Sequence, residues 1–162
     1  GSNFVLVGHS ERRMLYNETD ELVSKKIKRA IEENLNVILC IGENEDEKNK
    51  NITKKKLEQQ IFYSINERCN PSNTIIAYEP VWSIGSGSLP EVSEIEEINL
   101  FIQNTVKDKL KNEDNFKILY GGSVNSKNIS NILKSQLIDG VLVGGASLKS
   151  MEFIEIVNFN LN

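Results

Sequence analysis

The chain has 162 residues, of which 39% are hydrophobic and 26% are charged, as in an ordinary globular domain. Its net charge is −4, and its one basic run, Lys54 to Lys56, is expected to be a solvated helix face, so no nucleic-acid partner is indicated. No apolar run approaches the roughly 18 residues of a membrane span, and we expect no membrane partner. Cys40 and Cys69 form neither a disulfide framework nor a metal motif, which favours the reducing cytoplasm.

Short apolar runs recur along the chain, at residues 4–7, 37–41, 74–78, 116–120 and 140–143. Each is followed by a loop that contains glycine and then by a helical pattern. Runs of this length and composition are typical of buried strands. The alternation predicts repeated βα units, and hence a parallel sheet with right-handed crossovers.

The helices are predicted from apolar residues that recur three and four positions apart. The first helix begins where Thr19 or Asp20 could cap it. We expect every stripe to face the core; the stripes are Leu22, Val23, Ile27, Ala30 and Ile31, then Leu57, Ile61 and Ile65, then Ile95, Ile98, Phe101, Ile102 and Val106, then Ile129, Ile132 and Leu133, and finally Phe153, Ile154 and Val157. Functional sites in parallel sheets gather at the carboxyl ends of the strands.

The first strand leads into Gly8-His9-Ser10-Glu11-Arg12-Arg13, which contains the only histidine of the chain. A histidine at the mouth of a parallel sheet could polarise a substrate carbonyl or exchange protons. Arg12 and Arg13 are expected to pair with Glu11 or with neighbouring carboxylates rather than with a substrate.

The third strand runs into a carboxylate and a proline in the stretch AYEPVWSIGSG, residues 77–87. Pro80 cannot donate to a strand ladder, while Gly85 and Gly87 free the backbone that follows. The pattern predicts a carboxylate, Glu79, fixed at a strand end and followed by a hinged flap. The structural alternative is that Glu79 only caps a loop or forms an ion pair.

Two double-glycine loops follow the fourth and fifth strands, Gly121-Gly122-Ser123 and Gly144-Gly145-Ala146-Ser147. Backbone N–H groups near a helix start favour an anion, and glycine allows its close approach. In (β/α)8 barrels the loops after the last two strands commonly bind phosphate. Together the strand ends predict one acid or base, one polarising group and one phosphate site, with no metal-ligand cluster.

Four segments resemble signatures of the triosephosphate isomerase family, in that family's order. They are VLVGHSERR at 5–13, AYEPVWSIGSG at 77–87, LYGGSV at 119–124 and GVLVGGASL at 140–148. The resemblance covers nearly the whole chain. It implies interconversion of dihydroxyacetone phosphate and glyceraldehyde 3-phosphate, without a cofactor, by a cytoplasmic homodimer.

The resemblance also implies a role for each matching residue. His9 would be the electrophile that bonds the substrate oxygens, and Glu79 the base that moves a proton between adjacent carbons. Glu11 would be a supporting second carboxylate, and Ser10 would help to hold Glu79 in the open state. Phosphate would bind at Gly85, Ser123, Gly144 and Gly145, and residues 80–87 would form a lid. The pattern departs from the family where only Ser88 and Leu89 separate Gly87 from Pro90.

By this resemblance, residues 1–162 form a single C-terminal segment that corresponds to the last five βα units of an eight-unit barrel. Gly1 and Ser2 resemble a cloning remnant. The family's lysine and asparagine on the first strand, and the interface loop of the third unit, would precede the segment. We therefore expect the isolated chain to be inactive and able to self-associate.

Two questions stay open at this point. The βα units could form an open segment of a (β/α)8 TIM barrel or a flavodoxin-like sheet with helices on both faces; the single apolar stripe of each helix favours the barrel segment. The chain could also be a non-enzymatic fragment or assembly subunit that needs an N-terminal partner. A different phosphosugar barrel enzyme would keep the phosphate loops but not the His9 and Glu79 segments.

Overall fold

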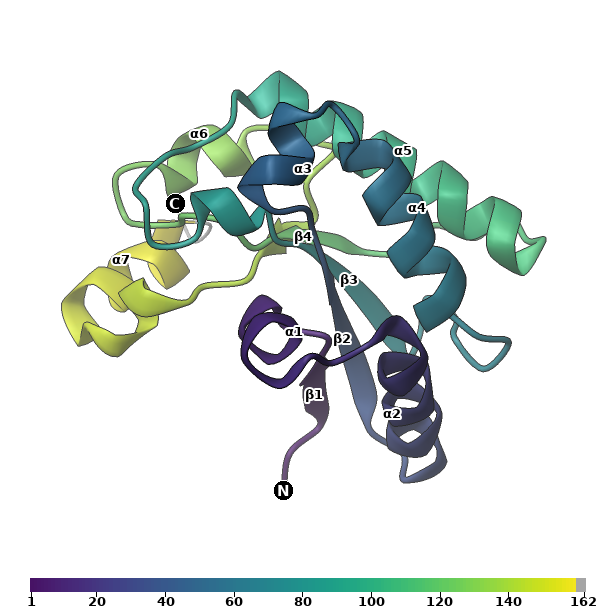
Figure 1. The fold of residues 1–162 in the computed structure, drawn as a ribbon. Coiled ribbons are helices and arrows are strands. Elements are labelled where there is room, and N and C mark those ends of the chain that lie inside the picture. Colours follow the sequence, from purple (N-terminus) through teal and green to yellow (C-terminus); the bar gives the residue numbers. More distant parts are fainter. Residues whose placement is uncertain (160–162) are drawn as a thin grey trace.

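A single parallel sheet organises the computed structural model, which describes residues 1–159 (Figure 1). Its strands are β1 (Phe4–Val7), β2 (Asn36–Ile41), β3 (Thr74–Tyr78), β4 (Ile118–Tyr120) and β5 (Gly140–Val141). The strands lie in the order β1-β2-β3-β4-β5, and every neighbouring pair is parallel. A flavodoxin-like sheet requires a reversal of strand order. The flavodoxin-like alternative is therefore wrong, and the strand order is that of a barrel segment.

The helices follow the strands in chain order. They are α1 (Ser10–Tyr16), α2 (Asp20–Glu32), α3 (Glu45–Asn49), α4 (Thr53–Ser64), α5 (Val92–Leu110), α6 (Ile129–Leu133) and α7 (Ser150–Asn158), with short 3₁₀ turns η1 (Val81–Ser83) and η2 (Gly145–Leu148). Helix α4 contacts both α2 and α5, so these three helices form a row over one face of the sheet (Figure 1). Of the two predicted caps for α2, Thr19 is the one used, because its side chain accepts the N–H of Leu22.

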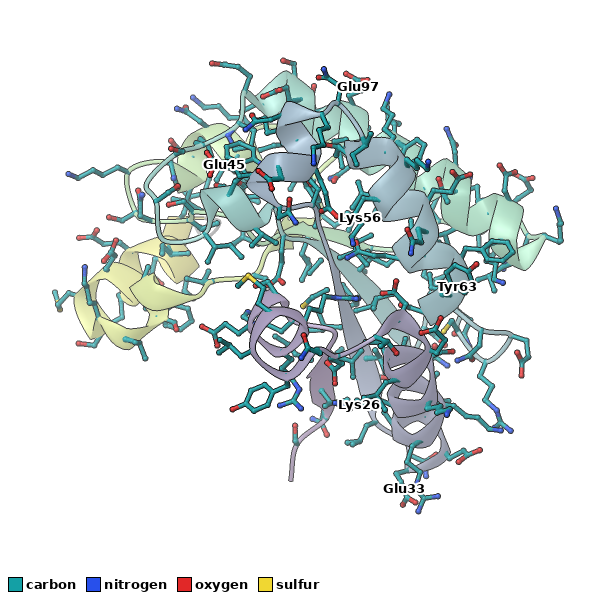
Figure 2. All side chains as sticks on the ribbon, viewed as in Figure 1. Lys26, Glu33, Glu45, Lys56, Tyr63 and Glu97 are labelled. Atoms are coloured by element: carbon teal, nitrogen blue, oxygen red, sulfur yellow. The ribbon has the colours of Figure 1, made fainter. Side chains whose placement is uncertain are left out.

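The core lies between this row of helices and the sheet face that it covers. Alternate residues of the strands point to that face and are fully buried, among them Leu39, Ile76 and Tyr120. They meet the predicted stripes of the helices in one cluster, which includes Ile27, Leu57, Ile61, Ile95 and Ile102. Charged side chains such as Glu33, Glu45 and Glu97 project from the outer surfaces of the helices (Figure 2).

The opposite face of the sheet is only partly covered within the described residues. Phe4 and Leu6 of β1 are each 44% exposed. Their neighbours across the face, Ile38 and Ile75, are half-buried. In a closed barrel the corresponding positions point into a filled interior. This face of the sheet therefore has the exposure pattern of an open barrel segment.

Some members of the predicted stripes are not buried, and for these residues the expectation was wrong. Leu22 on α2 and Ile154 and Val157 on α7 are exposed, and Phe153 is also exposed at 39%. On α7 only Ile156 is buried. Periodicity shows which residues share a helix face but not what lies opposite that face. Within the described residues α7 mainly contacts η2, which covers little of it.

No helix in the described part of the chain is long and apolar enough to cross a membrane. Cys40 and Cys69 are both buried, and each is a free cysteine.

Candidate active site

The loops that follow β1, β3, β4 and β5 converge on one cavity of about 360 Å³. Six of the predicted site residues line it: His9, Glu79, Gly85, Ser123, Gly144 and Gly145. Apolar residues, Leu6, Ile84 and Leu142 among them, complete its wall. Parallel strands bring their carboxyl ends to one edge of the sheet, so residues far apart in the sequence meet there.

Glu79 is held at the centre of this edge by the backbone around it. Its N–H donates to the carbonyl of Ile41 at 2.7 Å, which continues the β2–β3 ladder by one residue. Gly42 lies so close that a Cβ there would stand 1.8 Å from the Glu79 carbonyl oxygen. A Cβ on Gly121 would stand 2.9 Å from the Glu79 side chain. Glycine just beyond β2 is therefore required for the Glu79 backbone to lie here, and glycine just beyond β4 leaves room for its side chain.

The Glu79 carboxylate contacts both residues that follow Gly8. Its Oε1 lies 3.3 Å from Nε2 of His9, and its Oε2 accepts the backbone N–H of Ser10 at 3.3 Å. The other ring nitrogen of His9, Nδ1, accepts the N–H of Glu11 at 3.3 Å. Because Nδ1 accepts a hydrogen bond, the neutral ring carries its proton on Nε2, where it can donate to an oxygen in the cavity.

Burial controls the acidity of Glu79, which is only 3% exposed. Desolvation raises the pKa of the carboxyl above its ordinary value, while His9 and the Ser10 N–H act in the opposite direction. Cys40 on β2 adds a weak donor to the same carboxylate, and burial raises the pKa of its own thiol. A carboxylate with a raised pKa is a stronger base, which suits it to accept a proton from carbon near neutral pH.

The predicted flap begins at η1 and contains two glycines in the left-handed region, Gly85 with φ 68° and Gly87 with φ 75°. Ser83 Oγ donates to the carbonyl of Ser88 at 2.6 Å and lies 3.2 Å from the hydroxyl of Tyr120. It also accepts the N–H of Ser123 at 3.3 Å. Ser83 thus connects the flap to the loop after β4 by hydrogen bonds in this conformation.

Gly85, Ser123, Gly144 and Gly145 all line the cavity. A Cβ added to Gly144 or to Gly145 would meet no atom within 4 Å. The chain therefore leaves open space at both residues.

Three residues of α1, Glu11, Arg12 and Arg13, lie outside the cavity. Glu11 is exposed in the first turn of α1. Arg12 bonds Glu18, and Arg13 bonds Asp20 and the carbonyl of Gly8. The two arginines therefore pair with carboxylates, as expected, although the partners are not Glu11.

Sequence reasoning did not identify Gly42, Gly121 or Cys40 as supports of Glu79. Each lies at or just beyond a strand end, which was the available signal. Within residues 1–159, no group of three or more His, Cys, Asp and Glu side chains could hold a metal ion.

Comparisons with known proteins agree on one family. The model of the family described as triosephosphate isomerase matches residues 1–160. The triosephosphate isomerase of Alkaliphilus oremlandii is 42% identical over 98% of this chain and 66% of its own length. That of Buchnera aphidicola subsp. Schizaphis graminum is 44% identical, over 99% and 64% respectively. A crystal structure of triosephosphate isomerase from Bartonella henselae matches with a TM-score of 0.89 at 32% identity, covering all of this chain and 65% of that one.

Proposed function

The chain belongs to the triosephosphate isomerase family, and on this premise we propose that a barrel containing it interconverts dihydroxyacetone phosphate and glyceraldehyde 3-phosphate without a cofactor. The chain spans about 65% of the length of the relatives it matches, so the activity is proposed for the larger barrel. The observation that carries the proposal is the meeting of Glu79 and His9 in a cavity that both double-glycine loops also line.

In the proposed reaction Glu79 is the base. Its carboxylate takes a proton from one carbon of the substrate, giving an enediolate, and returns it to the adjacent carbon. Desolvation favours this transfer because it raises the pKa of the carboxyl. The carboxylate must first leave the N–H of Ser10 and Nε2 of His9, which it contacts now. This contact supports a resting role for Ser10, through its backbone rather than its hydroxyl.

His9 is the proposed electrophile. The N–H of Glu11 bonds Nδ1, so Nε2 presents its proton to the cavity. A donor placed there stabilises the negative charge that develops on the substrate oxygens. Glu11 is proposed to support this arrangement from outside the cavity, because its backbone orients the His9 ring.

The phosphate of the substrate is proposed to bind between Gly85, Ser123, Gly144 and Gly145. Residues 80–87 would close over it, using the left-handed glycines Gly85 and Gly87. Closure would exclude water from an enediolate that could otherwise lose its phosphate. From the family we also propose a homodimer, and buried free Cys40 and Cys69 fit a cytoplasmic location.

The test uses a completed barrel, defined as this chain joined behind the N-terminal part of the Clostridium botulinum relative, which is 44% identical over 98% of the chain. In this protein Glu79→Gln should lower kcat by roughly 10²- to 10⁴-fold, because the amide keeps the shape and loses the basicity. Affinity for a phosphosugar analogue should stay within about threefold, since the phosphate contacts are intact.

The matched control is Glu67→Gln, which removes an exposed carboxylate that does not line the cavity. It should leave both values unchanged. Turnover of Glu79→Gln close to that of the unmodified completed barrel would remove Glu79 from the role of base.

A further inference from the structure

A second cavity, of about 400 Å³, lies at the base of the flap and shares no lining residue with the candidate active site. It opens between α3, the start of α4 and the start of α5. Trp82, at the start of the flap, and Pro90, three residues beyond its end, form part of its wall. We propose that this cavity binds small organic cations that carry a primary ammonium or amidinium group on an aromatic body.

A buried carboxylate supplies the first reason. Glu43, which follows β2, lines the cavity and is 1% exposed. Its Oε1 accepts the indole N–H of Trp82 at 2.7 Å and the hydroxyl of Tyr78 at 3.2 Å. Its Oε2 is buried and has no hydrogen-bond partner among the described residues. A buried carboxylate oxygen without a donor is costly, and a shift of the Glu43 side chain that brought Oε2 to a ligand N–H would remove that cost.

An aromatic surface supplies the second reason. The ammonium of Lys48 lies 3.3 Å from the centre of the Trp82 ring, so the protein already places a cation on this face. Cations are attracted to the face of an indole, and the attraction grows when water is excluded. Ile95 and Ile98 of α5 line the same cavity and offer an apolar surface to the body of a ligand.

The charges around the cavity favour a cation over an anion. Its carboxylates are Glu43, Glu94 and Glu97, whereas its cations are Lys48 and Lys54. Lys54 is paired with Glu97 at 2.6 Å, and Lys48 rests on Trp82. Of the three carboxylates, Glu43 is the one with a buried oxygen that has no donor among the described residues. Burial raises its pKa while the Trp82 and Tyr78 donors oppose that shift, so the site should be probed in mildly alkaline buffer.

Trp82 is the only tryptophan of the chain, so its fluorescence reports on this cavity and on the flap that carries Trp82. The 162-residue chain would be titrated with benzylammonium chloride, with neutral benzyl alcohol and with sodium benzoate. Benzylammonium should give a saturable change in Trp82 fluorescence and bind at least about tenfold tighter than either analogue. The reason is that its ammonium would form a charge-assisted hydrogen bond with the Glu43 carboxylate. Equal affinity for benzyl alcohol, or a preference for benzoate, would overturn the proposal.

Two variants test the named contacts. Glu43→Gln should abolish the preference for benzylammonium over benzyl alcohol. Lys48→Met should tighten benzylammonium binding severalfold, because it removes the ammonium that competes for the Trp82 face. The matched control, Lys50→Met, changes a neighbouring exposed lysine that does not line the cavity and should have no effect. Unchanged or weaker binding by Lys48→Met would contradict the proposal even if Glu43→Gln failed to fold.

Discussion

At the scale of single residues, Glu79 combines burial with the capacity to carry charge. Its carboxylate is only partly compensated, by one backbone N–H, one imidazole and the weak donor Cys40. Desolvation is the largest influence on its pKa and raises it. Groups prepared for catalysis commonly reduce the stability of the fold that holds them. The same feature that would make Glu79 a good base should therefore destabilise the native state at neutral pH.

The pH dependence of this effect has a definite sign. The folded chain binds the Glu79 proton more tightly than the unfolded chain does, so the associated stability is present in acid and is lost as the pH rises through the folded pKa. Glu79→Gln cannot ionise, so it should not show this loss of stability as the pH rises. Thermal unfolding should show a higher Tm for Glu79→Gln than for the unmodified chain at neutral pH, with a smaller difference near about pH 4. A lower Tm for Glu79→Gln at neutral pH would show that the contacts to His9 and Ser10 outweigh desolvation.

A substitution at Gly144 should weaken ligand binding without affecting folding. Open space surrounds the position where its Cβ would lie, so Gly144→Val should leave Tm within about 1 °C of the unmodified protein. If phosphate approaches the backbone at this loop, the same change should weaken a phosphosugar analogue at least about tenfold in the completed barrel. Calorimetric titration measures the affinity. Equal affinity of the two proteins would count against this loop as the phosphate site.

The identity of the site residues could be predicted from sequence because they follow strands directly. His9, Glu79, Ser123 and the double glycine at 144–145 all come just after an apolar run, and the sheet brings those positions together. Their contacts could not be predicted. Whether Oε1 of Glu79 meets His9 depends on distances across strands, and the need for glycine at position 42 depends on the close approach of β2 and β3.

At the scale of elements, the helices with an apolar stripe were predictable, including the short helix α6, whereas α1 and α3 were not. Helix α3 spans only Glu45–Asn49 and has no buried residue. A capping box stabilises it, in which Asn44 and Glu47 each accept the backbone N–H of the other. Helix α1 exposes Leu15 and Tyr16 and buries only Ser10. Neither helix has the periodicity that a stripe-based prediction requires.

The end of α5 contains a conformation that its residue does not favour. Among the described residues, the non-glycine positions with positive φ are Asn17, Asn34, Asn51 and Lys111. Asparagine visits this region at lower cost than lysine, yet Lys111 adopts φ 55° as the C-cap of α5. Lys111→Gly should raise the free energy of unfolding by about 1 kcal/mol, because it removes the clash of Cβ with the backbone.

Denaturant unfolding of the chain would measure this gain. The matched control is Asp108→Gly, which places glycine inside the same helix and should lower stability by a few tenths of a kcal/mol. A loss of stability in Lys111→Gly similar to that in the control would mean that the left-handed turn costs nothing here.

At the scale of the whole molecule, the strand order was predictable because neighbouring βα units pair in sequence. The incomplete cover of the sheet was also expected for a barrel segment, and Phe4 and Leu6 show it most clearly. The exposed face of α7 was not predicted, because a stripe such as Ile154 and Val157 looks the same whether or not a partner covers it. Strands β1 and β5 end the sheet, and within residues 1–159 neither pairs with a second neighbour.

An open sheet should hold the site residues too loosely for efficient catalysis. Misplacement of a reacting group by about 1 Å can cost roughly 100-fold in rate. The loss of one preorganised electrostatic group costs roughly 100- to 1000-fold more. Relatives extend well beyond the stretch that the chain matches, and we propose that their additional strands supply such a group. The proposed chemistry therefore belongs to the completed barrel.

The most direct measurement is a coupled isomerase assay of the 162-residue chain and of the completed barrel at equal concentration. The completed barrel should turn over substrate, the chain alone should be slower by at least roughly 10⁴-fold, and Glu79→Gln should remove most of the activity of the completed barrel. Robust turnover by the chain alone would contradict the need for closure. An inactive completed barrel that is folded and binds a phosphosugar analogue would contradict the proposed function itself and favour a non-enzymatic role.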